Sequence, residues 1–471
     1  MNRERGATAG TSGTSGTPAT SATPGTPGTS GTGANPGANT EQDYERAQRR
    51  VLTVLVLGQL LAGAGLAAGV TVGALLAEDL LGGPGLSGLP SALFTGGSAL
   101  AAILVGKLSQ ARGRRPGLAT GFAFGALGAV GIVLATAMES LPLLFAAFVV
   151  YGSGTATNLQ ARYAGADLAT PERRGRALSY VLLGTTAGAV AGPNLVGPTG
   201  AVAESLGLTP LTGPFLLAAV AYGGAALVIS LLLRPDPLLE ARRREAAALD
   251  AAAASSSSST GSTDVPFPVP ARIWTGDVIT GVAVMALTQF VMVGLMTMTP
   301  VHMRAHDHAV TVVGLVISLH VAAMFLPAPL SGYLVDKFGT RLVAVSAGLV
   351  LLTSGVLAAV SPPQSTVLVS LALILLGLGW SLGLVAGTTV LTTSVPTSVR
   401  ATVQGQADVA VALAGAAGGL VSGLVFAWID FRGLGFALAA LSLIVVAAVR
   451  PRRAAGSAAG SVAESAQVTA G

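Results

Sequence analysis

Methionine and histidine are concentrated in one forty-residue stretch of this 471-residue chain. All four histidines and six of the eight methionines fall there: Met285, Met292, Met296, Met298, His302, Met303, His306, His308, His320 and Met324. Thioether sulfur is a soft, uncharged ligand that suits Cu(I), and imidazole suits copper as well. Thioether groups also sit in hydrocarbon without the cost of desolvating a carboxylate. This composition therefore favours transient copper binding inside a membrane.

Spacing selects four of these side chains as metal ligands. Met292 and Met296 are four residues apart in one apolar run, and His320 and Met324 are four apart in the next, so each pair lies on one face of a helix. The alternative is packing, because methionine fills irregular gaps and histidine can hydrogen-bond between helices. Both interpretations stay open. Four further histidine and methionine side chains near the outer end of the first run are either solvated or collect metal at the entrance to the membrane site: His302, Met303, His306 and His308.

The composition is that of a membrane protein. Apolar residues make up 51% of the chain, charged residues only 10%, and the mean hydropathy is +0.70, which is too apolar for a soluble chain of this length. We expect an all-α protein with twelve transmembrane helices, at 51–77, 90–106, 118–138, 142–162, 178–200, 212–233, 274–300, 312–335, 342–360, 365–390, 402–427 and 433–450. The absence of cysteine excludes disulfides and thiolate sites.

Basic residues predict the orientation. If both termini are cytoplasmic, 24 of the 26 lysines and arginines lie inside, and only Arg304 and Arg432 lie outside. No secretory signal precedes the first apolar run. We therefore expect a multi-pass protein of the cell's inner (plasma) membrane. The net charge of +5 needs no nucleic-acid partner, because anionic lipid and the insertion rule account for it.

A ten-residue pattern occurs twice, 226 residues apart. The first copy runs from Gly106 to Arg115 and the second from Gly332 to Arg341. Both resemble the loop signature of the major facilitator superfamily, Gly-x-Leu-x-Asp-x-x-Gly-Arg-Arg/Lys, although Gln110 stands at the aspartate position of the first copy. The resemblance implies two parallel six-helix halves that alternate around a midplane site.

The resemblance also implies a cytoplasmic gate. In that family the loop glycines allow tight turns, and the acid and arginines pair across the gate in one conformation. Because Gln110 lacks a charge, the pairing is expected to rest mainly on Asp336 and Arg341. The alternative is that the basic loops serve only topology. The gating set is Gly106, Gly113, Arg114, Gly332, Asp336, Gly339 and Arg341.

The two spaced pairs look like the motifs of the copper-importing branch of the major facilitators, which supplies copper for cytochrome oxidase assembly. That likeness implies copper uptake through Met292, Met296, His320 and Met324, with copper as substrate and no cofactor. Elsewhere, Asp408 is either a proton carrier in the cavity or a hydrated residue at the interface. Arg162, near the end of the fourth run, is expected to reach the membrane interface.

We therefore predict a secondary transporter that imports copper, and no enzyme. One rival is a proton-coupled exporter of small organic molecules, favoured by Asp408 and by Gly192-Pro193 in the fifth run; another is a metal sensor. The expected partners are a small-molecule or metal-ion substrate and the lipid bilayer. The expected regions are a disordered cytoplasmic tail at 1–45, six-helix halves at 46–234 and 272–450, a cytoplasmic linker at 235–271 and a second tail at 451–471.

Overall fold

The computed structural model describes residues 44–65, 89–191, 195–257 and 273–449. The fold described here is that of the unit that begins at Glu45. Residues 1–43 of the first predicted tail, the whole second tail, the linker after residue 257 and the Gly192-Pro193 pair lie outside the described residues. Every regular element among the described residues is helical, which confirms the predicted all-helical fold.

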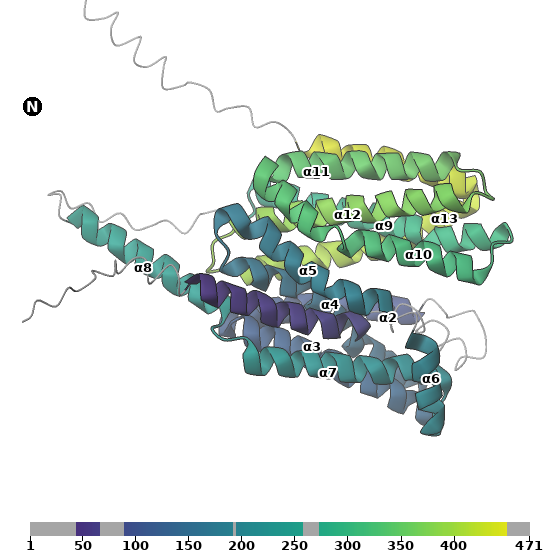
Figure 1. The fold of residues 1–471 in the computed structure, drawn as a ribbon, viewed down its shortest axis with the longest axis horizontal. Helices are drawn as coiled ribbons and strands as arrows, with labels where there is room; N and C mark the ends of the chain where they lie inside the picture. Colours follow the sequence, from purple (N-terminus) through teal and green to yellow (C-terminus); the bar gives the residue numbers. More distant parts are fainter. Residues whose placement is uncertain (1–43, 66–88, 192–194, 258–272, 450–471) are drawn as a thin grey trace, which may run out of the picture. The chain divides into compact units, whose positions relative to one another are not determined.

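The first half begins with a helix at residues 44–65. It continues with α2 (Leu89–Arg112), α3 (Arg114–Ala137), α4 (Leu141–Asp167), α5 (Arg174–Ala191), α6 (Val196–Ser205) and α7 (Gly213–Leu232), with short 3-10 turns at Pro171–Arg173 and Pro210–Thr212. Gly113 separates α2 from α3 with a φ of 99°, a left-handed conformation that favours glycine. The chain then enters the linker helix α8 (Pro237–Ser257), which extends away from the other helices in Figure 1.

The second half contains α9 (Gly276–Ala305), α10 (Val310–Phe325), α11 (Ala328–Val360), α12 (Thr366–Ser394) and α13 (Arg400–Ala448). Two of these helices are interrupted. Gly339 breaks α11 with a φ of 84°, and Asp430 breaks α13 with a φ of 58°. The run predicted at 312–335 is divided between α10 and the first segment of α11, because the helix is interrupted at Leu326-Pro327. The other segments beside the two breaks follow the runs predicted at 342–360, 402–427 and 433–450. Six stretches among the described residues are long and apolar enough to cross a membrane.

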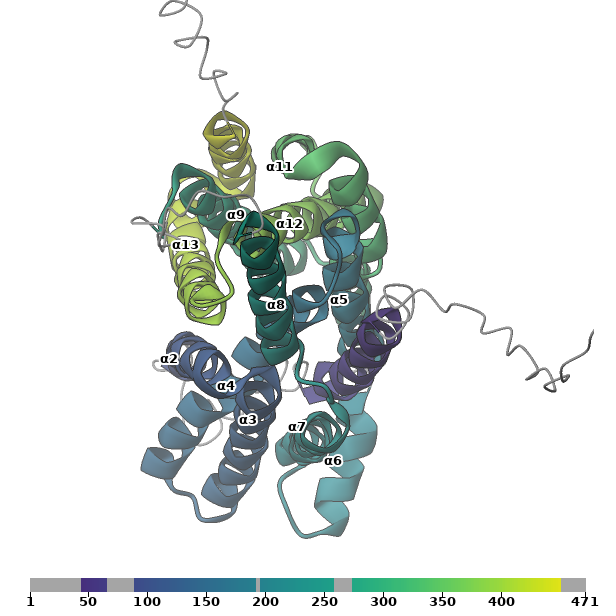
Figure 2. The same cartoon turned by 90° about the vertical axis from the view of Figure 1, so that its left-hand side faces the viewer.

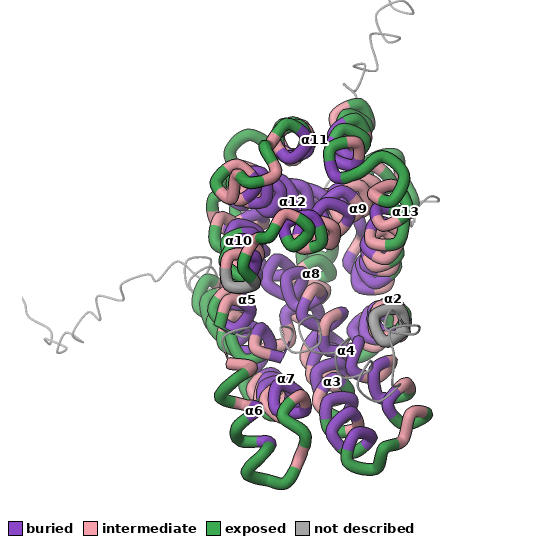
Figure 3. The backbone as a smooth tube through the Cα atoms, turned by 90° about the vertical axis from the view of Figure 1, so that its right-hand side faces the viewer, coloured by how far each residue is buried: buried purple, intermediate pink, exposed green. Residues whose placement is uncertain are grey.

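The buried and exposed faces fit a bilayer. Buried residues gather on the faces that the helices turn toward one another in Figure 3. Large apolar side chains such as Leu104, Leu127 and Leu424 are more than half exposed. Such a surface would be costly in water, whereas contact with lipid carries no such cost. The second half (α9 to α13) lies above the first in Figure 1, and α8 extends from one end of the helix bundle, the end that faces the viewer in Figure 2. We call this end of the two halves the linker end.

Candidate functional site

Gln110 and Asp336 join the two halves at the linker end. The Oε1 atom of Gln110 accepts a hydrogen bond from the Ala401 N–H at the start of α13 (2.8 Å). Asp336 accepts hydrogen bonds from the N–H groups of Gly175 (2.7 Å) and Arg176 (3.0 Å) at the start of α5. Each side chain therefore caps a helix of the opposite half, where unpaired N–H groups and the helix dipole favour an oxygen atom.

The two caps are related by the internal repeat. Gln110 and Asp336 are 226 residues apart, as are their partners Gly175 and Ala401. The repeat glycines Gly106 and Gly332 lie beside these caps, where the helices approach closely. A Cβ atom on Gly106 would lie 2.8 Å from the Ala401 carbonyl oxygen, and one on Gly332 would overlap the Gly175 backbone. A side chain at either glycine would therefore push the halves apart.

A buried charge cluster surrounds Arg114 and includes Gln404, which is one turn beyond Ala401 on α13. Its Nε donates to Asp167 Oδ2 (2.7 Å), and both side chains are fully buried. From the second half, Arg400 approaches the same carboxylate at 3.9 Å, and Gln404 accepts from the Arg114 guanidinium. The start of α3 is held by Asp236, which accepts from the backbone N–H of Arg114 (3.1 Å). These contacts tie the linker and both halves together.

A second buried ion pair includes Asp408, which is one turn beyond Gln404 on α13. Arg162 on α4 donates from Nη2 to Asp408 Oδ1 on α13 (2.7 Å) and from Nε to Thr388 Oγ1 on α12 (3.1 Å). The Tyr163 hydroxyl donates to the same Asp408 oxygen (3.1 Å). Arg162 is 0% exposed and Asp408 4%. Within the described residues, Asp408 Oδ2 has no hydrogen-bond partner, so this oxygen is open to a proton or a water molecule.

Two expectations are corrected by these contacts. Arg162 was expected to reach the membrane interface, but it is fully buried because Asp408, 246 residues away, supplies its counter-charge. Asp336 was expected to act with Arg341, but its ionic partner is Arg176 (3.1 Å), while Arg341 lines a cavity inside the second half. One sequence signal pointed to the Arg162–Asp408 pair: a basic and an acidic residue interrupt apolar runs of opposite halves.

The four predicted metal ligands lie in the second half at similar depth. Met292 and Met324 are buried in one apolar core, against which Met296 packs. On α12, Gly377 lies against the backbone of His320 and Met324. One turn further along α12, Trp380 Nε1 donates to Gln289 Oε1 (2.6 Å), one turn before Met292 on α9. Both pairs are thus carried by helices that pack against the same part of α12.

His320 has an asymmetric environment. Its Nδ1 lies 2.8 Å from the Leu373 carbonyl oxygen, and the side chain is fully buried. Because a carbonyl only accepts, Nδ1 must carry the proton, which leaves the lone pair on Nε2. Nε2 has no hydrogen-bond partner within the described part of the chain. The structure therefore presents one uncommitted imidazole nitrogen in an apolar core.

The residues predicted at the outer mouth pack against the protein. The rings of His302 and Phe431 are stacked with centroids 4.1 Å apart, and the centroids of the His302 and His306 rings are 4.5 Å apart. The Nδ1 atom of His306, the residue that follows α9, lies 2.8 Å from the His302 carbonyl oxygen in the last turn of the helix. Met303 is fully buried. These contacts give the cluster a packing role at the end of α9.

His308 connects two loops of the second half. Its Nε2 lies 2.9 Å from the Pro363 carbonyl oxygen and its Nδ1 lies 3.3 Å from Thr366 Oγ1, so both ring nitrogens are engaged. In the ranges that the structure describes, no group of three or more His, Asp or Glu side chains is placed to hold a metal ion. His308 therefore links the loop after α9 to the loop before α12, and its role in collecting metal stays a prediction.

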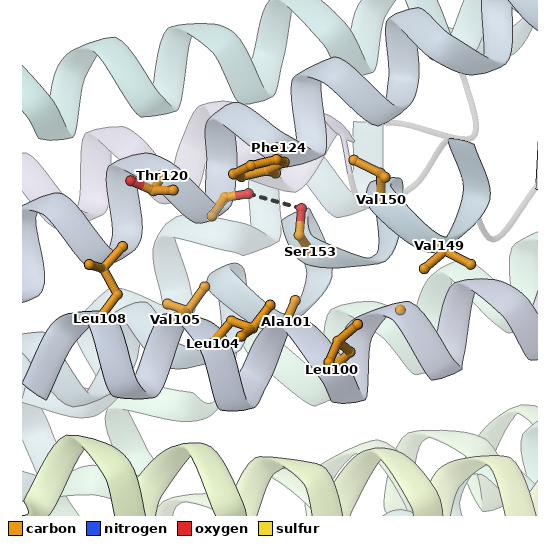
Figure 4. A pocket seen from close by; sticks show the side chains of 12 residues that line it. Leu100, Ala101, Leu104, Val105, Leu108, Thr120, Phe124, Val149, Val150 and Ser153 are labelled. Carbon is orange, nitrogen blue, oxygen red and sulfur yellow. Dashed lines mark hydrogen bonds between the residues drawn. The ribbon is translucent and has the colours of Figure 1, made fainter. Parts of the chain in front are cut away.

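A hollow of about 240 Å³ lies on the outer face of the first half, among α2, α3 and α4 (Figure 4). Leu100, Leu104 and Phe124 line it and are about half exposed. The Ser153 hydroxyl at its wall donates to the Gly121 carbonyl (3.0 Å). The hollow suits lipid hydrocarbon and offers little to orient a polar solute, so the candidate site is the interface between the halves.

The chain matches a known transporter family over most of its length. Residues 55–419 and 282–469 match the profile of the Major Facilitator Superfamily (MFS). The chain is 49% identical over 342 residues to the uncharacterized MFS-type transporter YdeG of Bacillus subtilis, covering 73% of this chain and 77% of that protein. It is 28% identical over 351 residues to the riboflavin transporter RfnT of Brucella anthropi, covering 73% and 81%.

The fold is also found among solved structures. The human organic anion transporter MFSD10 superposes with a TM-score of 0.67 at 20% identity, covering 86% of this chain and 99% of that one. At this identity the likeness shows the fold alone.

Proposed function

Because the chain belongs to the Major Facilitator Superfamily, whose members are membrane transporters and not enzymes, we propose that it is a proton-coupled secondary carrier of a small organic molecule. The buried Arg162–Asp408 pair carries this proposal, because it joins opposite halves inside the membrane region. A carrier that alternates between two open states must separate its halves at each end in turn. Opening the linker end would therefore break this pair.

Protonation of Asp408 would make that opening easier. Separating Arg162 from an ionised Asp408 would leave two buried charges without partners, which is costly. A proton on the carboxyl group would remove one charge and weaken its hold on the guanidinium. Asp408 Oδ2, which has no partner among the described residues, is the atom that would take the proton. Proton binding and gate opening would thus be linked.

Polar groups beside this pair support an organic substrate. Gln59 Nε2 donates to the Asn158 carbonyl (2.9 Å) and to Thr185 Oγ1 (3.1 Å). Within the described residues, Gln59 Oε1 and Asn158 Nδ2 are buried without partners. Asn158 is one turn from Arg162 on α4. A free acceptor and a free donor suit an organic molecule with amide-like groups, and the relative RfnT is a riboflavin transporter.

Proton movement driven by a solute tests this function. Purified carrier in liposomes that contain a pH-sensitive dye would be given riboflavin, nucleosides, sugars and amino acids in turn. We expect one solute to drive proton movement, and Asp408→Asn to lower its rate by at least about tenfold, or ~1.4 kcal/mol, while solute exchange without a pH gradient persists. Asp430→Asn, an exposed carboxylate in the same helix, is the control. Unchanged proton movement in Asp408→Asn would contradict the proposal.

Copper uptake is the second candidate, and the environment of His320 favours it. A ring held through Nδ1–H by a carbonyl is oriented to ligate metal through Nε2, and this atom is buried. Met324 lies one turn further along α10, in the same apolar core as Met292. Soft thioethers and one imidazole would suit Cu(I). In this second proposal, Met292, Met296, His320 and Met324 bind the ion during transport.

Competition with a chromogenic Cu(I) chelator tests this candidate on the purified protein. We expect Met292→Leu, Met296→Leu and Met324→Leu each to weaken binding, because Leu keeps the volume and normally costs less than about 1.5 kcal/mol in packing. A double variant should lose less than the sum of the single losses, because ligands of one ion act together. Met298→Leu on the same helix is the control. Wild-type protein that takes no Cu(I) from the chelator would rule this candidate out.

A further inference from the structure

The hydrogen-bond partners of Arg162 are divided between the two halves. Two of them lie on its own helix, α4, where Nη1 donates to the Leu159 carbonyl and Nη2 to the Tyr163 hydroxyl (3.1 Å). The other two among the described residues belong to the second half: Nε donates to Thr388 Oγ1 (3.1 Å) and Nη2 to Asp408 Oδ1 (2.7 Å). Opening of the linker end would remove the two partners of the second half and leave the two on α4 in place.

The two donors that opening sets free form a fork that suits a carboxylate. The Nε–H and one Nη2–H of an arginine point in the same direction along one edge of the planar guanidinium. This edge matches the two oxygens of a carboxylate, which accept from it as a bidentate pair. Arg162 is fully buried, and a buried charge without a partner is costly. An anion that took the place of Asp408 at this edge would remove that cost.

The charge balance of the pair links this anion to the proton. In this structure Arg162 and an ionised Asp408 form a neutral pair. Once Asp408 is protonated, Arg162 carries the excess charge, and one monovalent anion restores neutrality. A neutral solute would leave the guanidinium unpaired, and a cation would be repelled. The proton and the anion would therefore bind together, which gives the coupling a physical cause.

The other charged groups near the pair also favour an anion. Arg114 and Arg400 share the carboxylate of Asp167, at 2.7 and 3.9 Å, so this cluster adds positive charge beside the site. Arg114 lies 5.9 Å from the ring centroid of Tyr163, and Arg162 lies 4.4 Å from the same centroid. Because Asp167 already occupies the Nε atom of Arg114, the fork that opening sets free is the one on Arg162.

Uncharged polar groups of the first half suit the remainder of such a molecule. Asn158 is four residues before Arg162 on α4, so the two side chains lie on one face of the helix, about 6 Å apart along its axis. Asn158 Nδ2 and Gln59 Oε1 are buried without hydrogen-bond partners in the part of the chain that the structure describes. One donor and one acceptor together match the C=O and N–H of an amide group.

Resting on the proton-coupled function proposed above, we propose that the substrate is a small monocarboxylate that also carries an amide group, such as an N-acyl amino acid. Its carboxylate binds the Nε–Nη2 edge of Arg162 in place of Asp408, and its amide group lies at Asn158 and Gln59. One proton moves with each anion, so the two together carry no net charge across the membrane.

Binding to the purified carrier compares the anion with its neutral counterpart. Isothermal titration is carried out with N-acetylglycine and its primary amide, N-acetylglycinamide, which differ in charge at nearly equal size. The free carboxylate is ionised at both about pH 5 and about pH 8. We expect wild type at the lower pH to bind the carboxylate at least about tenfold more tightly than the amide, and the preference to shrink at the higher pH, where Asp408 keeps Arg162. Equal affinity for the two solutes, or no binding of the carboxylate, would overturn the proposal.

Variants of the pair locate the bound anion. Arg162→Lys keeps the positive charge but lacks the fork, and we expect it to lower the affinity for the carboxylate at least about tenfold without changing that for the amide. Asp408→Asn imitates the protonated state and should bind the carboxylate equally well at both pH values. Arg173→Lys, at a mostly exposed arginine that pairs with Glu45 (3.9 Å), is the matched control. Unchanged affinity in Arg162→Lys would contradict the assignment, and the comparison of the two solutes on wild type decides it if neither variant of the pair folds.

Transport in liposomes separates the carboxylate assignment from proton coupling. A potassium diffusion potential of about 100 mV should change carboxylate-driven proton uptake by less than about twofold after subtraction of the protein-free rate, whereas a proton moved with a neutral solute should respond by up to about 50-fold. Proton movement driven only by neutral solutes would keep the proton-coupled function and overturn the carboxylate assignment. Binding of the carboxylate at Arg162 without any proton movement would do the reverse.

Discussion

Asp408→Asn should destabilise the folded carrier more than the simultaneous replacement of Arg162 and Asp408 by apolar residues. The single change leaves the fully buried Arg162 without its counter-charge, and breaking a buried pair from one side typically costs about 3–5 kcal/mol. Arg162→Met with Asp408→Leu removes both charges at similar volume, a change that is often close to neutral. The free energies of unfolding of wild type, Asp408→Asn, Arg162→Met, Asp408→Leu and the double variant in one detergent would measure this difference.

The same set of proteins separates stability from function. The double variant should be folded and stable, yet without proton-driven transport, because it lacks the group that takes the proton. Asp430→Asn serves again as the control, since this carboxylate is exposed and lies at the break inside α13, far along the helix from Asp408. Losses of stability that simply add in the double variant would contradict a buried pair that acts as a unit.

Arg114→Leu should lower stability far more than Arg176→Leu, although both arginines form an ion pair at the linker end. Arg114 and Asp167 are both fully buried, so the change leaves Asp167 with Arg400, at 3.9 Å, as its ionic contact among the described residues. We expect a loss of about 3–5 kcal/mol. Arg176 is 39% exposed in its pair with Asp336, and we expect a loss below about 1 kcal/mol.

Thermal unfolding of the two variants at equal protein and detergent concentration would compare these losses. Asp336 keeps its backbone hydrogen bonds to Gly175 and Arg176 when the Arg176 side chain is removed, which is a further reason for the smaller effect. Equal losses for both variants would show that burial does not decide the strength of these pairs.

Local pattern alone determined much of the fold. Apolar runs placed the membrane helices, because a segment in hydrocarbon must satisfy its own backbone hydrogen bonds. The repeated signature located the helix breaks at Gly113 and Gly339, because positive φ angles favour glycine. It also located the positions, Gln110 and Asp336, where the halves meet. Each of these inferences depends on neighbouring residues.

Tertiary structure decided the partners. Arg162 meets Asp408 across 246 residues, and Asp336 meets Arg176 across 160. Helical spacing predicts which face a side chain occupies, but it does not say which side chain of another helix lies opposite, because that depends on how the helices pack. For the same reason, sequence left open whether Asp408 was hydrated, whereas packing of the two halves buried it beside a guanidinium.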